Sequence, residues 1–226
     1  LTGFTHPNTD SAFLGGALDL VVVTLAMAFA GTVIAACVAF ALAPLATRLL
    51  TVRGYLRDAP RRARIAWLLV TGTRGGFQLF RALPDLVWAL VFVVWVGPGP
   101  FAGMLAITVY TIGILGRLFC EIYEEAEPGP PGVLEASGAG PFGCWAVGVL
   151  PQVAPRLLAF TLFRFEVNVR ATAMVGFVGA GGIGDAIHTA ISLFHMADLA
   201  TLLGVLIAVV VIVDAVGDAM RRRLLR

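Results

Sequence analysis

The sequence contains no lysine, and all sixteen of its basic residues are arginine. A phosphate-cradling P-loop needs a lysine on the β- and γ-phosphates of its nucleotide. The chain therefore cannot carry an ordinary Walker-type ATP site, and enzymes that form a lysine Schiff base are excluded for the same reason. If ATP drives this protein, another subunit has to supply the hydrolysis.

Cysteine and charge are also scarce. The three cysteines, Cys37, Cys120 and Cys144, are scattered and show neither a CxxC pair nor the spacing of metal ligands, so no metal site and no catalytic residue are predicted. Charged residues make up 13% of the chain, whereas hydrophobic residues make up 59%. This composition is typical of an integral membrane protein and not of a soluble domain.

The apolar residues gather in long segments. A transmembrane helix needs about 20 mostly apolar residues, and the sequence has room for about five such helices joined by short loops. We therefore expect an all-α membrane protein, with the second span kinked at Pro84. The predicted spans cover residues 18–43, 65–96, 101–122, 156–177 and 199–219.

Arginine clusters predict the orientation of these spans. One cluster covers residues 48–64 and the other residues 221–226. Basic residues close to a span mark the cytoplasmic side of the membrane. Five spans satisfy both clusters if the C-terminus is cytoplasmic and residues 1–17 form an external segment. Residues 18–226 then make up one transmembrane domain with a cytoplasmic loop at 123–156.

Residues 132–155 form a polar, glycine-broken island within that loop. The island contains Ala136-Ser137-Gly138-Ala139 and closes with Leu150-Pro151. This pattern resembles the EAA loop of ABC-importer permeases, in which two short helices joined at a glycine dock into a cytosolic ATPase. The resemblance implies a coupling role, and it places Gly138 at a bend where a bulky side chain would clash. An ordinary re-entrant or connecting loop is the alternative. The implied coupling residues are Glu135, Ala136, Gly138, Ala139, Leu150 and Pro151.

A second glycine-rich segment contains GxGxxG but does not bind a dinucleotide, because that motif requires a preceding strand. It follows a membrane span instead, which predicts a tight external turn with positive φ angles. The turn could lie at the mouth of a pore or serve helix packing. Its glycines are Gly179, Gly181, Gly182 and Gly184.

The span over residues 156–177 is unusually polar for a membrane helix. Ionisable residues in spans usually face the bundle interior or a water-filled path. Glu166 and Arg170 are expected to neutralise each other on one face. Arg164 has no acidic residue three or four positions away, so it is the candidate to contact a passing anion; alternatively, it pairs with an acid on another helix or snorkels. The predicted path stripe comprises Thr161, Arg164, Asn168 and Thr172.

The kinked span at residues 65–96 carries a similar polar stripe, which adds Arg74 to the predicted path. The alternative is that Arg74 pairs with Glu166 or with the acidic run at 121–127. Ion pairing or exposure to solvent explains that acidic run better than a role in acid–base catalysis.

Several further segments resemble one subfamily of ABC permeases, and together the resemblance covers roughly residues 18–225. They are RALPDLVWALVF at 81–92, GPFAGMLA at 99–106, LPQVAPRLLAFTLFRFEVNVRA at 150–171, GFVGAGGIGDAI at 176–187 and LFHMADLATLL at 193–203. The chain is similar to permeases of phosphonate-type importers.

This resemblance implies a type I permease bundle in the bacterial inner membrane. It further implies a homodimer with two cytosolic ATPase subunits, which carry ATP and Mg²⁺, and an external substrate-binding protein, with no nucleic acid as a partner. The implied cargo is phosphonate, phosphite or phosphate. One position departs from the pattern: Gly132 stands where the family has glutamate, and Glu135 is the residue that could replace it. A secondary transporter or channel that works without ATP is the alternative function.

Overall fold

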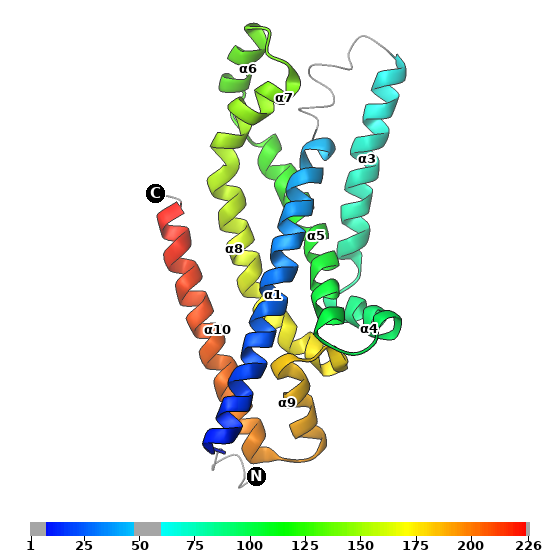
Figure 1. Ribbon diagram of the computed structural model, residues 1–226. Coiled ribbons are helices and arrows are strands. Elements are labelled where there is room, and N and C mark those ends of the chain that lie inside the picture. Colours follow the sequence, from blue (N-terminus) through cyan, green and yellow to red (C-terminus); the bar gives the residue numbers. More distant parts are fainter. Residues whose placement is uncertain (1–7, 48–59, 225–226) are drawn as a thin grey trace. The chain divides into compact units, whose positions relative to one another are not determined.

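The computed structural model describes residues 8–47 and 60–224, and within these ranges the chain is helical with no strand (Figure 1). The predicted residues 1–7 of the external segment and the arginines at 48–57 lie outside the described residues. The elements are α1 (Ser11–Ala46), α3 (Pro60–Ala82), α4 (Asp85–Val96), α5 (Pro100–Glu124), α6 (Gly129–Ala136), α7 (Pro141–Gly143), the π-helix η2 (Cys144–Val149), α8 (Leu150–Val175), the π-helix η3 (Gly176–Ala180), α9 (Gly182–Ser192) and α10 (Met196–Leu224).

Within the described residues, four helical segments are long and apolar enough to cross a membrane: Ser11–Ala46, Pro100–Glu124, Cys144–Ala180 and Met196–Leu224. The pair α3 and α4 makes a fifth if it counts as one broken span. The all-α class is confirmed, and the four or five candidate spans agree with the prediction of about five. At Pro84, however, the helix is interrupted and not merely kinked. Pro84 has extended backbone (φ −58°, ψ 152°), and its carbonyl accepts the amide hydrogen of Val87 in the first turn of α4.

Helix α1 extends beyond the predicted span at both ends. It begins at Ser11 and continues through Pro44 to Ala46, where the backbone N–H and the hydroxyl of Thr47 both donate to the Pro44 carbonyl. Residues 11–17 are therefore helical, and their place outside the membrane stays a prediction.

The chain divides into two compact units. The first comprises Leu1–Ile34, Leu83–Tyr110 and Leu162–Arg222, and the second comprises Ala35–Ala82, Thr111–Thr161 and Arg223–Arg226. Helices α1, α5 and α8 contribute residues to both.

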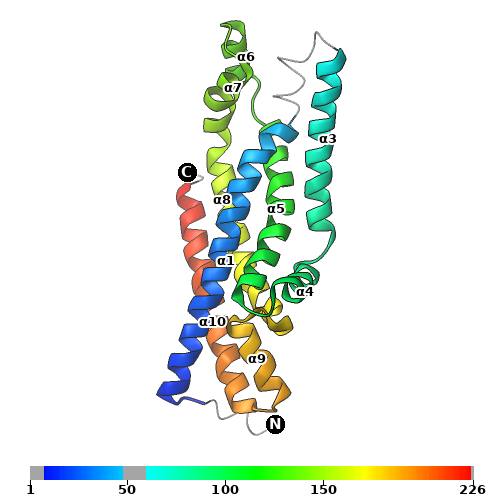
Figure 2. The same cartoon turned by 45° about the vertical axis from the view of Figure 1, so that its right-hand side comes forward.

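The core of the second unit is built on small residues. Ala35, Ala39 and Ala43 of α1 follow one another at every fourth position and are fully buried against aromatic and aliphatic side chains of α3, α5 and α8. Small residues let helix backbones approach closely. Helices α3 and α5, which run side by side in Figure 2, also approach closely at a small residue. A Cβ added at Gly116 of α5 would run into the ring of Phe77 of α3.

The first unit has two apolar clusters. One joins Val21 of α1 to Ile183 of α9 and Leu202 of α10. The other joins Phe92 of α4 to Ala106 of α5 and to the end of the helix that begins as α8. These clusters position the polar residues of α8 and α10 described below.

Candidate functional site

The loop after α5 folds as two short helices joined at Gly138. Helix α6 ends at Ala136, and Gly138 has a left-handed backbone with φ +84°. Its amide donates to the carbonyl of Glu135, and that of Ala139 donates to the carbonyl of Leu134, both at 3.0 Å. These two bonds form a Schellman motif, which satisfies the last carbonyls of a helix and reverses the chain. The predicted bend at a glycine is therefore present, but the second helix, α7, has three residues and continues without a break into η2 and α8.

Helix α6 packs against the start of the following span, and Figures 1 and 2 both show α6 and α7 next to each other there. Gly148 of η2 lies beneath Pro131, so closely that an added Cβ would come within 2.9 Å of the Pro131 Cα. The indole of Trp145 contacts the rings of Tyr123 and Phe142 at centroid distances of 6.1 and 5.7 Å. Aromatic contacts and this close approach hold the loop on its span.

The loop exposes three large apolar side chains. Val133, Phe142 and Val147 are 68%, 72% and 67% exposed. Exposed apolar side chains that lie together mark interaction surfaces. Among the residues predicted to couple, four are exposed and two are half-buried: Glu135, Ala136, Gly138 and Pro151 are the exposed ones, and Ala139 and Leu150 the half-buried ones.

The clash expected at Gly138 is absent. A Cβ added there would meet no atom within 4 Å, because the bend faces away from the rest of the chain. The positive φ angle alone therefore favours glycine at this position, since a left-handed backbone is strained for residues with a side chain.

Polar residues of α8 lie at a second place, in the first unit. The expected pairing of Glu166 with Arg170 is wrong. Glu166 is only 4% exposed and forms an ion pair with Arg221 of α10. Arg170 forms an ion pair with Asp214, which also lies on α10, at 2.5 Å. Helical spacing shows which residues share a face, but long side chains can reach past their own helix to a neighbouring one.

Gly217 makes room for the buried carboxylate of this arrangement. A Cβ added at Gly217 would overlap the Glu166 carboxylate, so a larger residue at this position of α10 would displace the carboxylate.

Arg164 has no such carboxylate partner. Its guanidinium carbon lies 5.1 Å from the centroid of the Tyr110 ring, and its Nε is buried without a hydrogen-bond partner in the part of the chain that the structure describes. No carboxylate of the described residues forms an ion pair with it. No sequence pattern indicated Tyr110, because its contact with Arg164 joins two helices.

The other residues of the predicted stripe are engaged within the chain. The amide of Asn168 is buried and donates to the Thr32 hydroxyl at 2.8 Å. The Thr172 hydroxyl, also buried, donates to the carbonyl of Val169 at 2.6 Å. Thr161 donates to its own helix through the carbonyl of Leu157. Their path role stays a prediction.

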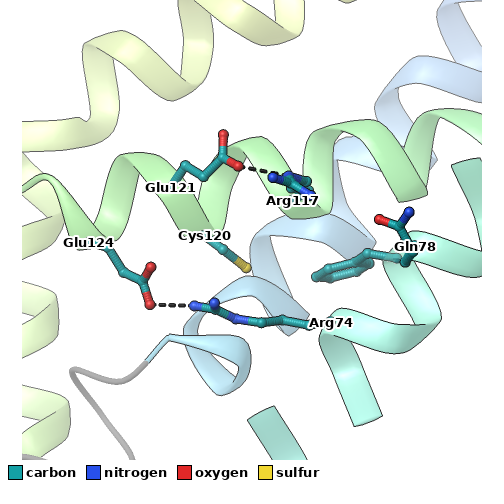
Figure 3. A pocket seen from close by; sticks show the side chains of 7 residues that line it. Arg74, Gln78, Arg117, Cys120, Glu121 and Glu124 are labelled. Atoms are coloured by element: carbon teal, nitrogen blue, oxygen red, sulfur yellow. Dashed lines mark hydrogen bonds and ion pairs between the residues drawn. The ribbon is translucent and has the colours of Figure 1, made fainter. Parts of the chain in front are cut away.

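Arg74 pairs with Glu124, as the alternative reading allowed, and its Nε also donates to the carbonyl of Ala46 at 2.9 Å. Figure 3 shows this pair in a cavity of about 150 Å³. A second pair, Arg117 with Glu121 at 2.7 Å, lies beside it. Both arginines of the cavity are therefore neutralised. Phe77, Gln78 and Cys120 complete the lining.

The glycine-rich segment after α8 is an irregular turn, as expected. Gly179, Gly181 and Gly182 have φ angles of +84°, +74° and +72°. The carbonyl of Gly179 accepts a hydrogen bond from the amide of Gly99 at 2.9 Å, which ties this turn to the start of α5. Gly184 serves close packing instead, since an added Cβ would run into the Ala173 carbonyl. The external location of the turn stays a prediction.

Comparison with known proteins decides the family. The family of binding-protein-dependent transport system inner membrane components matches residues 64–226. The chain belongs to this family. As an inner-membrane component of a transport system, it carries the loop described above within the matched region.

Relatives of this inner-membrane component agree with that assignment. The chain is 35% identical over 200 residues to HtxC, a putative phosphite transport system permease protein of Stutzerimonas stutzeri. It is 34% identical over 206 residues to PhnE, a phosphate-import permease protein of Mycolicibacterium smegmatis. These matches cover 88% and 91% of the chain, but only 66% and 36% of the respective relatives.

The fold of the inner-membrane component is that of type I ABC-importer permeases. The MetNI methionine ABC transporter in inward-facing conformations matches it with a TM-score of 0.71 at 25% identity. The match covers 91% of this chain and 94% of the transporter chain. The type I bundle predicted from the sequence is thereby confirmed.

Proposed function

We propose that this chain is the permease subunit of an ATP-driven importer for a phosphorus oxyanion. Its cargo is phosphonate, phosphite or phosphate; the relatives HtxC and PhnE are named for phosphite transport and phosphate import. Two copies form the path between them, and an external binding protein delivers the anion. Two cytosolic ATPase subunits bind ATP and Mg²⁺ and perform the hydrolysis, for which this chain has no P-loop lysine.

The loop at residues 123–156 carries this proposal. The chain changes direction at Gly138, between the two short helices of the loop. Trp145 packs against Tyr123 and holds the loop on its span. The apolar side chains of Val133 and Phe142 are exposed. An apolar projection on a rigid base is the shape that fits a groove on another protein. We place the ATPase on this surface, which puts the loop and the C-terminus in the cytoplasm. Residues 1–17 and the turn at Gly179 then lie outside.

Glu135 supplies the polar contact to the ATPase in this proposal. It is exposed on α6 and lies three residues after Gly132, so both positions share one face of the helix. A Cβ added at Gly132 would meet no atom within 4 Å. A glutamate at position 132 is therefore accommodated, and it would reach the same partner surface one helical turn earlier.

The test moves the acidic side chain from position 135 to position 132. In proteoliposomes that contain the permease and its ATPase, Glu135→Ala is expected to lower the hydrolysis stimulated by the binding protein, and Gly132→Glu in the same chain is expected to restore it. Glu127→Ala removes an exposed acid outside α6 and serves as the matched control. Unchanged stimulation in Glu135→Ala would remove this residue from the contact. A wild-type complex without any stimulated hydrolysis would overturn the proposed function itself.

Orientation is tested at the two ends of α10. A cysteine at Arg223 is expected to react only with reagents added from the cytoplasmic side. A cysteine at Phe194, which is 78% exposed in the turn before α10, is expected to react only from outside. The reverse pattern would contradict the orientation derived from the arginine clusters.

A further inference from the structure

Arg164 differs from the other arginines of α5 and α8. These two helices contain four arginines. Among the described residues, only Arg164 of these four has no carboxylate oxygen within 4.0 Å of its nitrogens. A charge within a membrane span is costly and is usually paired or placed in an aqueous path. The paired arginines are Arg117 with Glu121, Arg156 with Glu125 and Arg170 with Asp214.

The contact with Tyr110 holds Arg164 without neutralising it. The guanidinium lies over the ring face at 5.1 Å, within the range of cation–π attraction. Its Nε is buried and donates to no group of the described chain. An aromatic ring carries no net charge, so it does not neutralise the guanidinium. The Nε donor of Arg164 also stays unused within the described chain.

We propose that Arg164, held over the ring of Tyr110, is the residue that the phosphorus oxyanion contacts during its passage. The proposal rests on the proposed function. A guanidinium presents two parallel N–H donors that match the oxygens of a phosphate-like anion. Transport requires binding that is favourable enough to admit the anion and weak enough to release it. A single guanidinium that rests on an uncharged ring provides such a transient contact.

The experiment restores the charge chemically. Cys37, Cys120 and Cys144 are replaced by serine, alanine and serine, and Arg164→Cys is introduced into this background. The full transporter is reconstituted with its ATPase and binding protein, and uptake is measured with inorganic phosphate, phosphite and methylphosphonate. The anion that the cysteine-free parent takes up fastest is then used. Arg170→Cys, on the same helix, is the matched control.

Uptake per assembled complex is expected to fall by about tenfold or more in Arg164→Cys, the size of effect that loss of a charge-assisted hydrogen bond produces. Treatment with aminoethyl methanethiosulfonate attaches an ammonium group and is expected to restore uptake. A neutral methyl reagent is expected to leave it low. Arg170→Cys is expected to respond equally to both reagents.

Equal effects of the ammonium and methyl reagents on Arg164→Cys, or uptake at the parental rate before treatment, would overturn the proposal. These results differ from failure of the proposed function, in which the parent itself shows no ATP-dependent uptake of any of the three anions.

A second pair of variants addresses the ring and does not depend on cysteine chemistry. Tyr110→Phe keeps the aromatic face and is expected to transport at the parental rate. Tyr110→Leu removes it and is expected to lower uptake severalfold with an unchanged amount of assembled complex. Equal uptake by the two variants would contradict the role of the ring.

Discussion

Arg164 and Arg170 lie on the same helix, yet the structure treats them differently. Arg170 is half exposed and forms an ion pair with Asp214 of α10 at 2.5 Å. Arg164 has a tyrosine ring beneath it and no carboxylate within ion-pair distance among the described residues. The difference separates two uses of charge in one span. The paired charges join α8 to α10, whereas the unpaired one is free to meet a ligand.

The largest effect is expected at the most buried of these pairs. Arg221→Met leaves the Glu166 carboxylate, which is 4% exposed, without its cation. Breaking a buried pair from one side destabilises by about 3–5 kcal/mol, because the remaining charge stays desolvated. We expect a lower Tm of the detergent-solubilised permease and less folded protein in the membrane.

The double variant Arg221→Met with Glu166→Gln is the control for this prediction. It removes both charges and is expected to recover most of the lost stability. A double variant as unstable as the single one would show that the packing of Arg221, and not the pairing, is what matters.

The partners in these pairs could not be predicted from helical spacing. Spacing placed Glu166 and Arg170 one turn apart, and an ion pair between them was the expected result. In the structure each reaches α10, because Gly217 lets that helix approach α8 closely enough for side chains to meet across the gap. Which helices become neighbours depends on packing along the whole chain, and no local pattern contains that information.

The loop at residues 123–156 was easier to predict because its geometry is local. A glycine after a short helix is enough to indicate a left-handed C-cap, and Gly138 has that conformation. What the sequence could not indicate is the space around it. The clash expected there is absent since the bend faces outward. The spans were likewise predictable from apolar runs, except that Pro84 interrupts its helix completely.

A smaller effect is expected at Gly217, where the pairing is disturbed through space. Gly217→Val places a side chain where the Glu166 carboxylate lies. The carboxylate has to move away from Arg221, and overpacking of this kind typically costs about 1–3 kcal/mol. The Tm should fall less than in Arg221→Met. Combined with Glu166→Ala, which removes the obstructing carboxylate, Gly217→Val should cost little more than Glu166→Ala alone; full additivity would mean that the valine clashes elsewhere.

A still smaller effect is expected at Arg170. The pair with Asp214 is 50% and 39% exposed at its two side chains. Exposed ion pairs contribute at most about 1 kcal/mol, since water screens both charges. Arg170→Gln should therefore lower the Tm only slightly and leave anion uptake per folded molecule unchanged. A loss as large as that of Arg221→Met would mean that the Arg170–Asp214 pair is buried by a partner in the assembled complex.

The smallest change in stability is expected at Arg164, although the proposed effect of this residue on transport is the largest. Arg164→Gln gives up the contact with the Tyr110 ring, worth about 0.5–1 kcal/mol at partly exposed sites. The same substitution removes an unpaired charge from a membrane span, which is favourable by a comparable or larger amount. The two effects offset each other, so we expect the Tm and the yield of folded permease to stay close to those of the parent. The measurement is the Tm of the Arg164→Gln variant beside that of Arg170→Gln in the same detergent. A fall larger than that of Arg170→Gln would mean that Arg164 stabilises the fold, and the distinction between paired and unpaired charges on α8 would then no longer separate structure from transport.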